Sequence, residues 1–406
     1  MFNLLPTIRK KKLWMTPLLI LSLTACSGQT GAPTGSVPNA QSPVQTPTTD
    51  SEIVDDTNDN EMTENENSDS AGSIEETTFT SSLTGEVETV TDQLNTPWDI
   101  QFADDTIYMT LRGGSIVKFE NGEQTQQTLT LSPEVLEEGE GGLLGFALAP
   151  DFADSRTAYV YHTYGEGNQI HNRVIQIKEA ADGANWNETA VLLDDIPGAR
   201  VHDGGRIAFG PDNMLYVTTG DAQDESSAQD PASVAGKILR MTPEGDIPSD
   251  NPIAGSLVYS YGHRNSQGID WLEDGTMYAS EHGPSGNPGG HDEMNKITPG
   301  ANYGWPDVIG DAEGEGLTAP LYHTGETAIA PSGIAATPDG KLLVANLRGE
   351  SLTLFDPQNN KMTELLTGVG RIRDVAIHDG QIYILTNNTD GRGSPSEKDD
   401  QLLIVR

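Results

Sequence analysis

Short runs in which apolar and polar residues alternate recur along the chain after residue 95, and they come in pairs separated by a turn. Alternation with a period of two residues is typical of a half-buried β-strand, and two such runs around a turn containing Asp or Gly predict a hairpin. The pairs recur at spacings of roughly 40 to 65 residues. The six pairs occupy residues 99–110, 145–163, 206–219, 268–280, 333–345 and 374–386.

Hairpins at this wide spacing predict a β-propeller, because each repeat is long enough for one four-stranded blade. We therefore expect an all-β, six-bladed β-propeller over residues 81–406. The 44 glycines and 24 prolines agree with a turn-rich β fold. A strand near Glu86 and the terminal segment 401–406 are expected to share one blade and close the ring. A pair of β-sandwiches and a parallel β-helix are weaker alternatives, since neither explains the spacing.

Residues 1–26 have the pattern of an export signal. Four basic residues from Arg9 to Lys12 precede an apolar run from Leu13 to Leu23, which is followed by Thr24, Ala25 and Cys26. This ending is typical of a lipoprotein signal peptide, and Cys26, the only cysteine, is the expected lipidation site. An ordinary secretory signal and a retained transmembrane helix are lesser alternatives, the latter because the run is short. We expect an exported lipoprotein, anchored to a membrane in the periplasm or on the cell surface.

Residues 27–80 contain 11 acidic and no basic residues among Ser, Thr, Pro, Gly and Asn. Such a segment cannot bury enough apolar surface to fold, so we expect a disordered acidic linker. The domain from 81 to 406 is also acidic, with 50 Asp and Glu against 19 Lys and Arg. Because phosphate binding needs a basic surface, nucleic acid is excluded as an expected partner.

Charged residues stand just before the first apolar residue of several repeats. His202 and Arg264 occupy the same position in the third and fourth copies, Glu140 lies before the second copy, and Arg371 and Arg373 lie before the sixth. In a propeller these positions surround one mouth of the central channel, so the side chains should converge on a concave site. Taken singly, the histidine could be structural and either arginine of the last pair could bind a neighbouring aspartate.

The spacing of Arg371 and Arg373 predicts that both guanidinium groups point to the same face of a strand. Two such groups side by side suit a ligand with several carboxylates. His202 is followed by Asp203, and we expect either this carboxylate or a nearby carbonyl to orient the imidazole. The glycines that follow are expected to let the strand begin close to a ligand.

A loop rich in Gly and Pro, residues 281–293, follows the fourth hairpin. Its backbone carbonyls are free of the sheet ladder, and hard cations such as calcium accept such oxygens together with carboxylates. A zinc site at His282 and His291 is less favoured, because the spacing is unusual and no cysteine is nearby. A plain connecting loop is the remaining alternative.

Six motifs, in this order, resemble the soluble pyrroloquinoline-quinone (PQQ)-dependent aldose sugar dehydrogenases of the glucose/sorbosone dehydrogenase family. The resemblance runs through nearly all of residues 86–406. The motifs are GEGGLLGFALAPDF (139–152), VHDGGRIAFG (201–210), YGHRNSQGI (261–269), SEHGPSG with HDEMN (280–295), NYGWPDV (302–308) and GRIRDV (370–375).

The resemblance implies that aldose sugars are oxidised at the anomeric carbon to lactones, with hydride transfer to PQQ and with calcium as a second cofactor. His202 matches the family's general base. Arg264 matches a catalytic residue, and Arg264 with Asn265 matches the pair that contacts the quinone and the substrate. An external electron acceptor completes the reaction, and loops shorter than in the dimeric glucose-type enzymes imply a monomer.

The resemblance also implies the cofactor and metal ligands. Arg371 and Arg373 match the arginines that hold the cofactor's carboxylates, and Arg348 stands where the family usually has a lysine. Glu140 departs from the glutamine of glucose-type members, and its charge would repel the cofactor unless calcium or an arginine compensates. For calcium, the matching positions are Gly283, Pro284 and Asp292 at a first site and Ile309, Asp311 and Glu313 at a second.

Two alternatives to the dehydrogenase remain. A calcium-dependent sugar lactonase shares the expected propeller, but it should present carboxylate or amide metal ligands at the strand starts in place of arginines. A non-enzymatic ligand-binding propeller would not need the cluster of His202 with several arginines.

Overall fold

The computed structural model describes residues 79–166, 169–286 and 289–406. The predicted signal peptide, Cys26 and the linker up to residue 78 lie outside the described residues. Strands dominate the described part of the chain, in which the two helices are short, α1 (Phe152–Ser155) and α2 (Glu225–Gln229). Neither helix is long and apolar enough to cross a bilayer.

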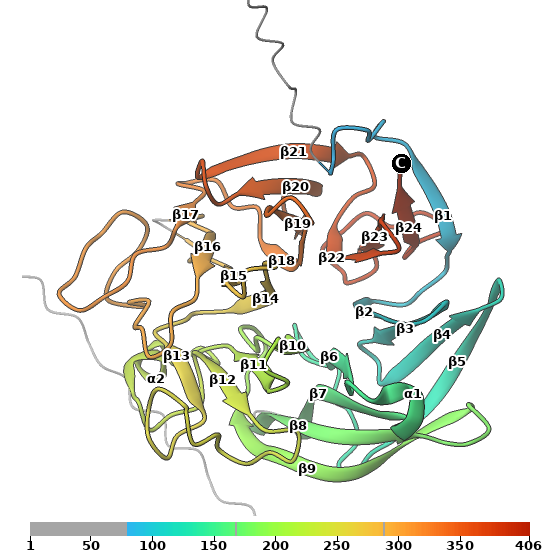
Figure 1. The fold of residues 1–406 in the computed structure, drawn as a ribbon, viewed down its shortest axis with the longest axis horizontal. Coiled ribbons are helices and arrows are strands. Elements are labelled where there is room, and N and C mark those ends of the chain that lie inside the picture. Colours follow the sequence, from blue (N-terminus) through green and yellow to red (C-terminus); the bar gives the residue numbers. More distant parts are fainter. Residues whose placement is uncertain (1–78, 167–168, 287–288) are drawn as a thin grey trace, which may run out of the picture. The chain divides into compact units, whose positions relative to one another are not determined.

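Three antiparallel sheets contain four consecutive strands each (Figure 1). Their first two strands are the hairpins predicted at 206–219, 268–280 and 333–345. The strands are β10 (Ile207–Phe209), β11 (Leu215–Thr219), β12 (Lys237–Met241) and β13 (Val258–Tyr261); β14 (Ser266–Trp271), β15 (Met277–Glu281), β16 (Glu293–Lys296) and β17 (Tyr322–His323); and β18 (Pro331–Ala336), β19 (Leu342–Asn346), β20 (Ser351–Asp356) and β21 (Lys361–Thr367).

A sheet of eight strands consists of two antiparallel meanders. Their outer strands β5 and β9 pair in parallel, from Thr128 opposite Asn185 to Thr130 opposite Asn187. The two predicted hairpins at 99–110 and 145–163 begin these meanders. The strands are β2 (Pro97–Ala103), β3 (Thr106–Leu111), β4 (Ser115–Glu120) and β5 (Glu123–Thr130), and β6 (Leu143–Leu148), β7 (Thr157–Glu166), β8 (Gln169–Glu179) and β9 (Asn185–Pro197).

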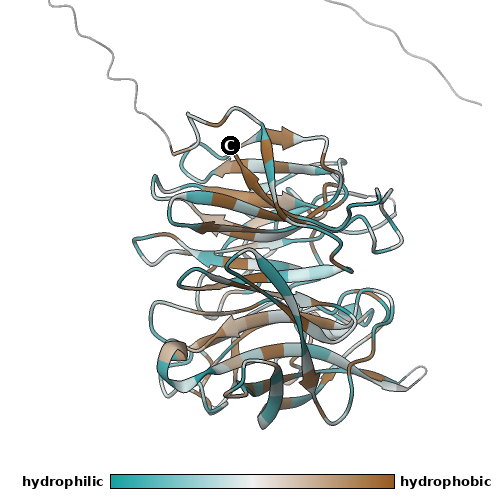
Figure 2. Ribbon diagram, turned by 90° about the vertical axis from the view of Figure 1, so that its right-hand side faces the viewer, coloured by the Kyte–Doolittle hydropathy of each residue, from teal (hydrophilic) through white to brown (hydrophobic). Residues whose placement is uncertain are grey.

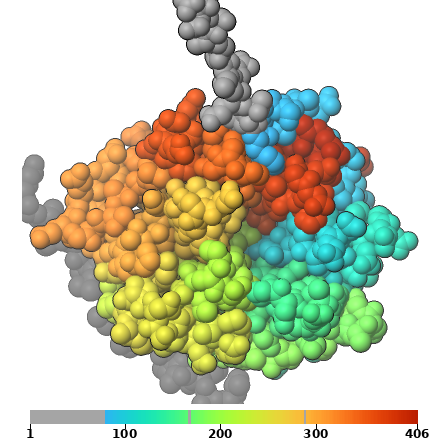
Figure 3. Space-filling model, viewed as in Figure 1, coloured from blue at the N-terminus to red at the C-terminus, as the bar shows by residue number. Residues whose placement is uncertain are grey.

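The first and last described strands share one sheet, as predicted. β1 (Val87–Thr91) pairs with β24 (Leu402–Val405), and β23 (Gln381–Thr386) and β22 (Ile372–His378) complete the four strands. The blue N-terminal strand therefore lies beside the dark red C-terminal strands (Figures 1 and 3). This pairing satisfies backbone groups that an open sheet edge would leave exposed.

The first strands of the meanders surround a common centre (Figure 1). Each contacts the next, through β2, β6, β10, β14, β18 and β22, and β22 contacts β2 again. Hydrophobic residues lie along the strands, and many connecting loops are hydrophilic (Figure 2). Alternating apolar residues thus pack between neighbouring sheets, as in the cluster that contains Trp98, Tyr159 and Ile207. The described fold is an all-β, propeller-like ring.

A buried ionic network ties three of these inner strands together. Arg206 Nη1 donates to Asp99 Oδ2 at 2.7 Å and to Asp374 Oδ2 at 3.2 Å, and its guanidinium lies 4.2 Å from the centre of the Trp98 ring. Burial raises the pKa of Asp99 to about 7, although the charge of Arg206 acts in the opposite direction. Because the network joins β2 and β22 to the residue before β10, it holds the strand starts in fixed relative positions.

Candidate active site

The predicted convergence of side chains at the strand starts is found in the structure. A cavity of about 340 Å³ opens there. Glu140 precedes β6, His202 precedes β10, Arg264 precedes β14 and Arg371 precedes β22, so one structural position recurs around the ring. The predicted site residues that line the cavity are Glu140, His202, Arg264, Gly283, Pro284, Asp292, Arg348 and Arg371.

His202 is held in a strained backbone conformation, with φ of +67°. Its backbone N–H donates to Glu140 Oε2 at 3.1 Å, and its imidazole Nδ1 lies 2.8 Å from Asp221 Oδ1. The other oxygen of this buried carboxylate accepts a 2.9 Å hydrogen bond from Trp305 Nε1. Asp221 therefore fixes Nδ1 as the protonated nitrogen and leaves the Nε2 lone pair of His202 free.

The prediction that Asp203 orients His202 is wrong. The Asp203 carboxylate is buried and bound elsewhere, since its Oδ1 accepts hydrogen bonds from Asn172 Nδ2 at 3.0 Å and from the backbone N–H of Ala199 at 3.2 Å. His202 has φ of +67° and lies outside any strand, so the regular alternation of a strand does not hold here, and the neighbour in sequence is not the hydrogen-bonded neighbour in space. Asp221, at the end of the second strand of the same hairpin, has the role instead.

The glycines after Asp203 lie where the chain packs closely on itself. A Cβ atom at Gly204 would lie 2.7 Å from the backbone nitrogen of Gly220, and one at Gly205 would lie 2.6 Å from Leu144 Cδ1. Both glycines have positive φ, of +64° and +101°. They permit close packing of the chain on itself, and this packing places His202 at the cavity.

Burial raises the pKa of Asp203 from 3.8 to about 7. A carboxyl group with a raised folded-state pKa stabilises the protein fully at low pH, and this stabilisation is lost as the pH rises from about 4 to 7. We expect the free energy of unfolding to fall by up to about 1.4 kcal/mol per pH unit from this group in that window. Asp203→Asn should remove that part of the pH dependence. Denaturant unfolding at pH 5 and 7.5 checks this, and equal pH dependence in both proteins would contradict it.

Glu140 is ionised and has a partner that the sequence did not indicate. Arg392, from the loop between β23 and β24, donates to Glu140 Oε1 at 2.9 Å. Burial alone would raise the pKa of Glu140, but the charge of His282 when it is protonated, the charge of Arg392 and the hydrogen bond from the His202 N–H lower that pKa to about 2. Burial lowers the pKa of His282, which also lines the cavity, to about 4, so its imidazole is neutral near pH 7. An arginine thus compensates the extra acid.

Arg264 enters the cavity as a buried cation. Its guanidinium Nη1 donates to the backbone oxygen of His282 at 3.2 Å and lies 5.4 Å from the centre of the Trp305 ring. Asn265 does not line the cavity, because its side chain is buried behind Glu140. There its Oδ1 accepts from the Gly204 N–H at 3.0 Å, and its Nδ2 lies 3.4 Å from Glu140 Oε2.

Arg371 and Arg373 differ in depth. Arg371 lines the cavity, where its Nη2 pairs with Asp390 Oδ2 at 2.9 Å. Arg373 does not line it and donates to Gln267 Oε1 at 2.7 Å. The pairing of β22 is irregular between Ile372 and Asp374, and only Arg371 of the predicted pair lines the cavity. Burial lowers the pKa of Arg373 to about 9, which leaves it a cation at neutral pH.

Arg348 completes the set of predicted cations. Its side chain is exposed and lines the cavity. Within the described residues, its guanidinium makes no hydrogen bond or ion pair. Every other arginine of the cavity has a protein partner, so Arg348 is the one whose whole guanidinium group is free to meet a ligand.

The first predicted calcium site lies at the cavity. No described residue donates a hydrogen bond to the carbonyl oxygens of Gly283 and Pro284. The Asp292 carboxylate holds this segment, since its Oδ1 accepts from the Gly283 N–H at 2.8 Å and its Oδ2 accepts from the Ile329 and Ala330 N–H groups at 2.6 and 2.7 Å. Asp292 is therefore already engaged by the backbone, and the two carbonyl oxygens are the free hard ligands.

The second predicted calcium site lies outside the cavity. The Asp311 carboxylate is exposed and accepts from His323 Nε2 at 3.0 Å, and the Ile309 carbonyl accepts from the Ala312 N–H at 3.3 Å. Glu313 is exposed. Over residues 79–166, 169–286 and 289–406, no three His, Cys, Asp or Glu side chains form a metal-binding group.

Several buried polar atoms at or near the cavity have no hydrogen-bond partner among the described residues. His282 Nε2, Arg371 Nε and Arg373 Nε are buried without a hydrogen-bond partner in the structure. Buried polar groups are normally paired, and two of these three residues, His282 and Arg371, line the cavity, so residues with unused hydrogen-bonding capacity surround it. Two of the three are guanidinium N–H donors, and they lie with Arg264 and Arg348 in an otherwise acidic protein. The donor set fits a ligand with several carboxylates, as PQQ is.

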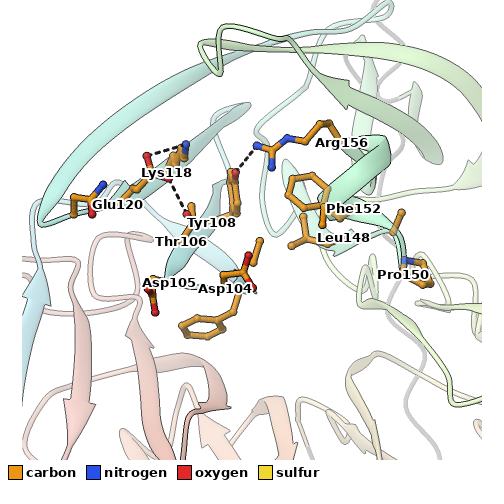
Figure 4. Close-up of a pocket in the computed structure, with 15 residues that line it drawn as sticks. Asp104, Asp105, Thr106, Tyr108, Lys118, Glu120, Leu148, Pro150, Phe152 and Arg156 are labelled. Atoms are coloured by element: carbon orange, nitrogen blue, oxygen red, sulfur yellow. Dashed lines mark hydrogen bonds and ion pairs between the residues drawn. The ribbon is translucent and has the colours of Figure 1, made fainter.

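A second cavity, of about 540 Å³, lies between strands β2 to β4 and helix α1 (Figure 4). The charged groups of its three long charged side chains have partners, since Lys118 Nζ lies 3.2 Å from Glu120 Oε2 and Arg156 Nη2 donates to the Tyr108 hydroxyl at 3.1 Å. None of the described buried atoms that lack a partner belongs to it. This cavity therefore gives no sign of a missing ligand.

Together, the ring of antiparallel sheets and the cavity beside His202, which several arginines line, define a propeller-like protein with a site suited to an anionic small molecule. The sequence model of the family described as glucose/sorbosone dehydrogenase matches residues 94–403. The chain belongs to this family.

Individual relatives agree with this assignment. The chain is 32% identical over 343 residues to an aldose sugar dehydrogenase of Escherichia coli, a match that covers 75% of this chain and 91% of the relative. It is 36% identical to the PQQ-bound aldose sugar dehydrogenase of Streptomyces coelicolor, with a TM-score of 0.73 over 80% of this chain and 99% of that structure. An oxidoreductase (glucose dehydrogenase) of Thermus thermophilus is 40% identical, also with a TM-score of 0.73, over 79% and 99% of the two chains.

Proposed function

We propose that this protein is a six-bladed β-propeller enzyme that oxidises aldose sugars at the anomeric carbon to lactones, with PQQ as cofactor. The observation that carries the proposal is the convergence of His202, Arg264, Arg348 and Arg371 on one cavity with unpaired buried N–H donors. The six hairpins and the closed series of inner-strand contacts support the six blades. Relatives named as aldose sugar dehydrogenases support the substrate class.

His202 acts as the general base. Its Nδ1–H is held by Asp221, so the free Nε2 takes the proton of the anomeric hydroxyl group as the carbonyl of the lactone forms. When bound, PQQ supplies the acceptor for the hydride that leaves the anomeric carbon. Arg264 stabilises the negative charge that develops on oxygen in the cavity, where low solvent access strengthens its effect.

The remaining arginines hold the cofactor. Arg371 and Arg348 line the cavity and would bind carboxylates, and Arg373 adds positive charge beneath them. Glu140 does not exclude an anion, because Arg392 neutralises its charge. The carbonyl oxygens of Gly283 and Pro284 would hold calcium, which as a Lewis acid withdraws electrons from an oxygen bound to it.

We propose further that the protein acts outside the cytoplasm as a monomeric lipoprotein. The basic and apolar pattern that ends at Cys26 supports export and lipid attachment to a membrane. The acidic segment before the domain would serve as a tether. Ile309, Asp311 and Glu313 remain the proposed positions for a second calcium ion. The reduced cofactor would pass its electrons to an external acceptor.

Purified protein without cofactor, incubated with PQQ and calcium, is expected to reduce an artificial dye when aldoses are added. Omission of PQQ should abolish the reaction. Lactone hydrolysis without PQQ would identify a calcium-dependent lactonase in its place. Sugar binding without turnover would identify a non-enzymatic propeller. No dye reduction with any aldose at any calcium concentration would overturn the proposed function.

A further inference from the structure

A buried chain of hydrogen bonds lies behind the cavity. Ser260 Oγ is 2.8 Å from His263 Nε2, and His263 Nδ1 is 2.8 Å from Glu281 Oε2. Ser260 and His263 are fully buried, and Glu281 is 3% exposed. The order serine, histidine, acid is that of a hydrolase triad, but none of the three lines the active-site cavity. A buried serine cannot reach a substrate, so these three residues do not form a hydrolase site. Their hydrogen bonds instead hold other parts of the protein in place.

The chain of hydrogen bonds ends on Arg264. Glu281 Oε1 accepts a hydrogen bond from the Arg264 backbone N–H. On the other side, the Arg264 backbone oxygen accepts from the Asp221 N–H at 2.8 Å. Both backbone groups of Arg264 are therefore hydrogen-bonded, its N–H to Glu281 and its carbonyl oxygen to Asp221, which is also the partner of His202.

Glu281 is itself fixed by several elements. Asn295 Nδ2, on β16, lies 3.4 Å from Glu281 Oε2, and Glu281 is the last residue of β15. The His263 ring stacks on Tyr303, with 4.8 Å between ring centres and 24° between ring planes. Because each group has a packed or hydrogen-bonded neighbour, the carboxylate has little freedom to move, and neither has the Arg264 backbone.

We infer that Glu281 and His263 are positioning residues, which set the place of the Arg264 guanidinium in the cavity. This inference rests on the proposed function, in which Arg264 stabilises charge on the reacting oxygen. Small misplacement of such a group costs much of its effect, since the stabilisation depends on alignment in the transition state. Ser260 supports the imidazole and is one step further from Arg264.

Three substitutions test the inference. Glu281→Met removes both acceptors from a side chain of similar size, and kcat is expected to fall roughly 10- to 100-fold, with KM for the sugar changed less than about threefold. Glu281→Gln keeps one acceptor for the Arg264 N–H, and His263 can present its other tautomer to the amide, so most of the lost kcat should return. His263→Phe keeps the stack on Tyr303 but loses both hydrogen bonds, and it should give an intermediate loss.

His162→Gln is the matched control. His162 is equally buried, and its Nε2 accepts a 2.7 Å hydrogen bond from Arg173 Nε, but it does not line the cavity. The control should lower Tm with kcat within about twofold of the parent, because a buried hydrogen bond is lost without effect on Arg264. The dissociation constant for PQQ, from absorbance titration of the cofactor-free protein, is a second readout and should rise several-fold in Glu281→Met, less in His263→Phe and not in the control.

Glu281→Met with kcat and PQQ affinity equal to those of the control would overturn the inference. If Glu281→Met does not fold, the same comparison is made with His263→Phe. Failure of the proposed function is seen separately, because the unaltered protein then reduces no dye before any variant is compared.

Discussion

His202→Ala is expected to lower kcat for aldose oxidation by roughly 10²- to 10⁴-fold, the usual contribution of a general base. The dissociation constant for PQQ should change little. The reason is geometric, since the imidazole lines the cavity with Nε2 free while Nδ1 is held by Asp221, and the cavity's arginines remain in place. Stopped-flow or steady-state dye reduction at saturating sugar, together with cofactor titration, measures both quantities.

The backbone at this position calls for a second variant. His202 has φ of +67°, which alanine adopts less readily than asparagine does. His202→Asn should therefore keep more of the stability of the parent and show the same loss of kcat. Normal turnover in either variant would remove His202 from the role of base.

Arg371→Ala is expected to weaken PQQ binding first. Charge-assisted hydrogen bonds contribute about 1.5–3 kcal/mol, so the dissociation constant should rise roughly 10- to 100-fold. Arg371 is buried at the cavity with its Nε unpaired, so a donor is ready for the ligand. Absorbance or fluorescence titration of the cofactor-free protein gives the dissociation constant, and kcat at saturating PQQ should change less.

Loss of Arg371 also leaves Asp390 without its cation, so a control for stability is needed. Arg240→Ala provides one, because Arg240 is equally buried and forms ion pairs with Asp212 and Asp250, both at 2.8 Å, away from the cavity. This control should lower Tm and leave PQQ affinity unchanged. Equal loss of affinity in both variants would mean that Arg371 acts only through stability.

The hairpins were predictable because a strand with one buried face repeats every two residues, and the turns between the paired strands carry Asp, Asn or Gly. The same regularity made the strand starts comparable between repeats. The sequence alone therefore predicted that four residues at these strand starts share one cavity, namely Glu140, His202, Arg264 and Arg371. The pairing of β1 with β24 in one sheet was predictable because a free sheet edge must be covered.

The residues that sequence reasoning missed lie where the repeat gives no register. Arg392 is in a long loop between β23 and β24. Its only distinguishing feature in the sequence is its positive charge, which is rare in this acidic domain. Asp221 lies at the end of a second strand, and it reaches His202 through close packing at Gly204 and Gly220. His282 lines the cavity, whereas its sequence context suggested only a less favoured zinc site.

The position of Arg373 shows a second limit of prediction from sequence, which is that strand pairing can be irregular. Alternation along a regular strand would bring both Arg371 and Arg373 to the cavity, but the pairing of β22 is irregular after Ile372 and only Arg371 lines the cavity. Irregularities of this kind depend on contacts across the sheet and leave no mark in a single sequence.

Stoichiometric titration tests the central claim most directly. Increasing amounts of PQQ are added to a fixed amount of purified cofactor-free protein with calcium, and the rate of aldose-dependent dye reduction is measured at each point. If the cavity beside His202 is the one cofactor site, the rate should rise linearly to one equivalent of PQQ per chain and then stay constant. No rise, or a rise that continues without a break past one equivalent, would contradict the account.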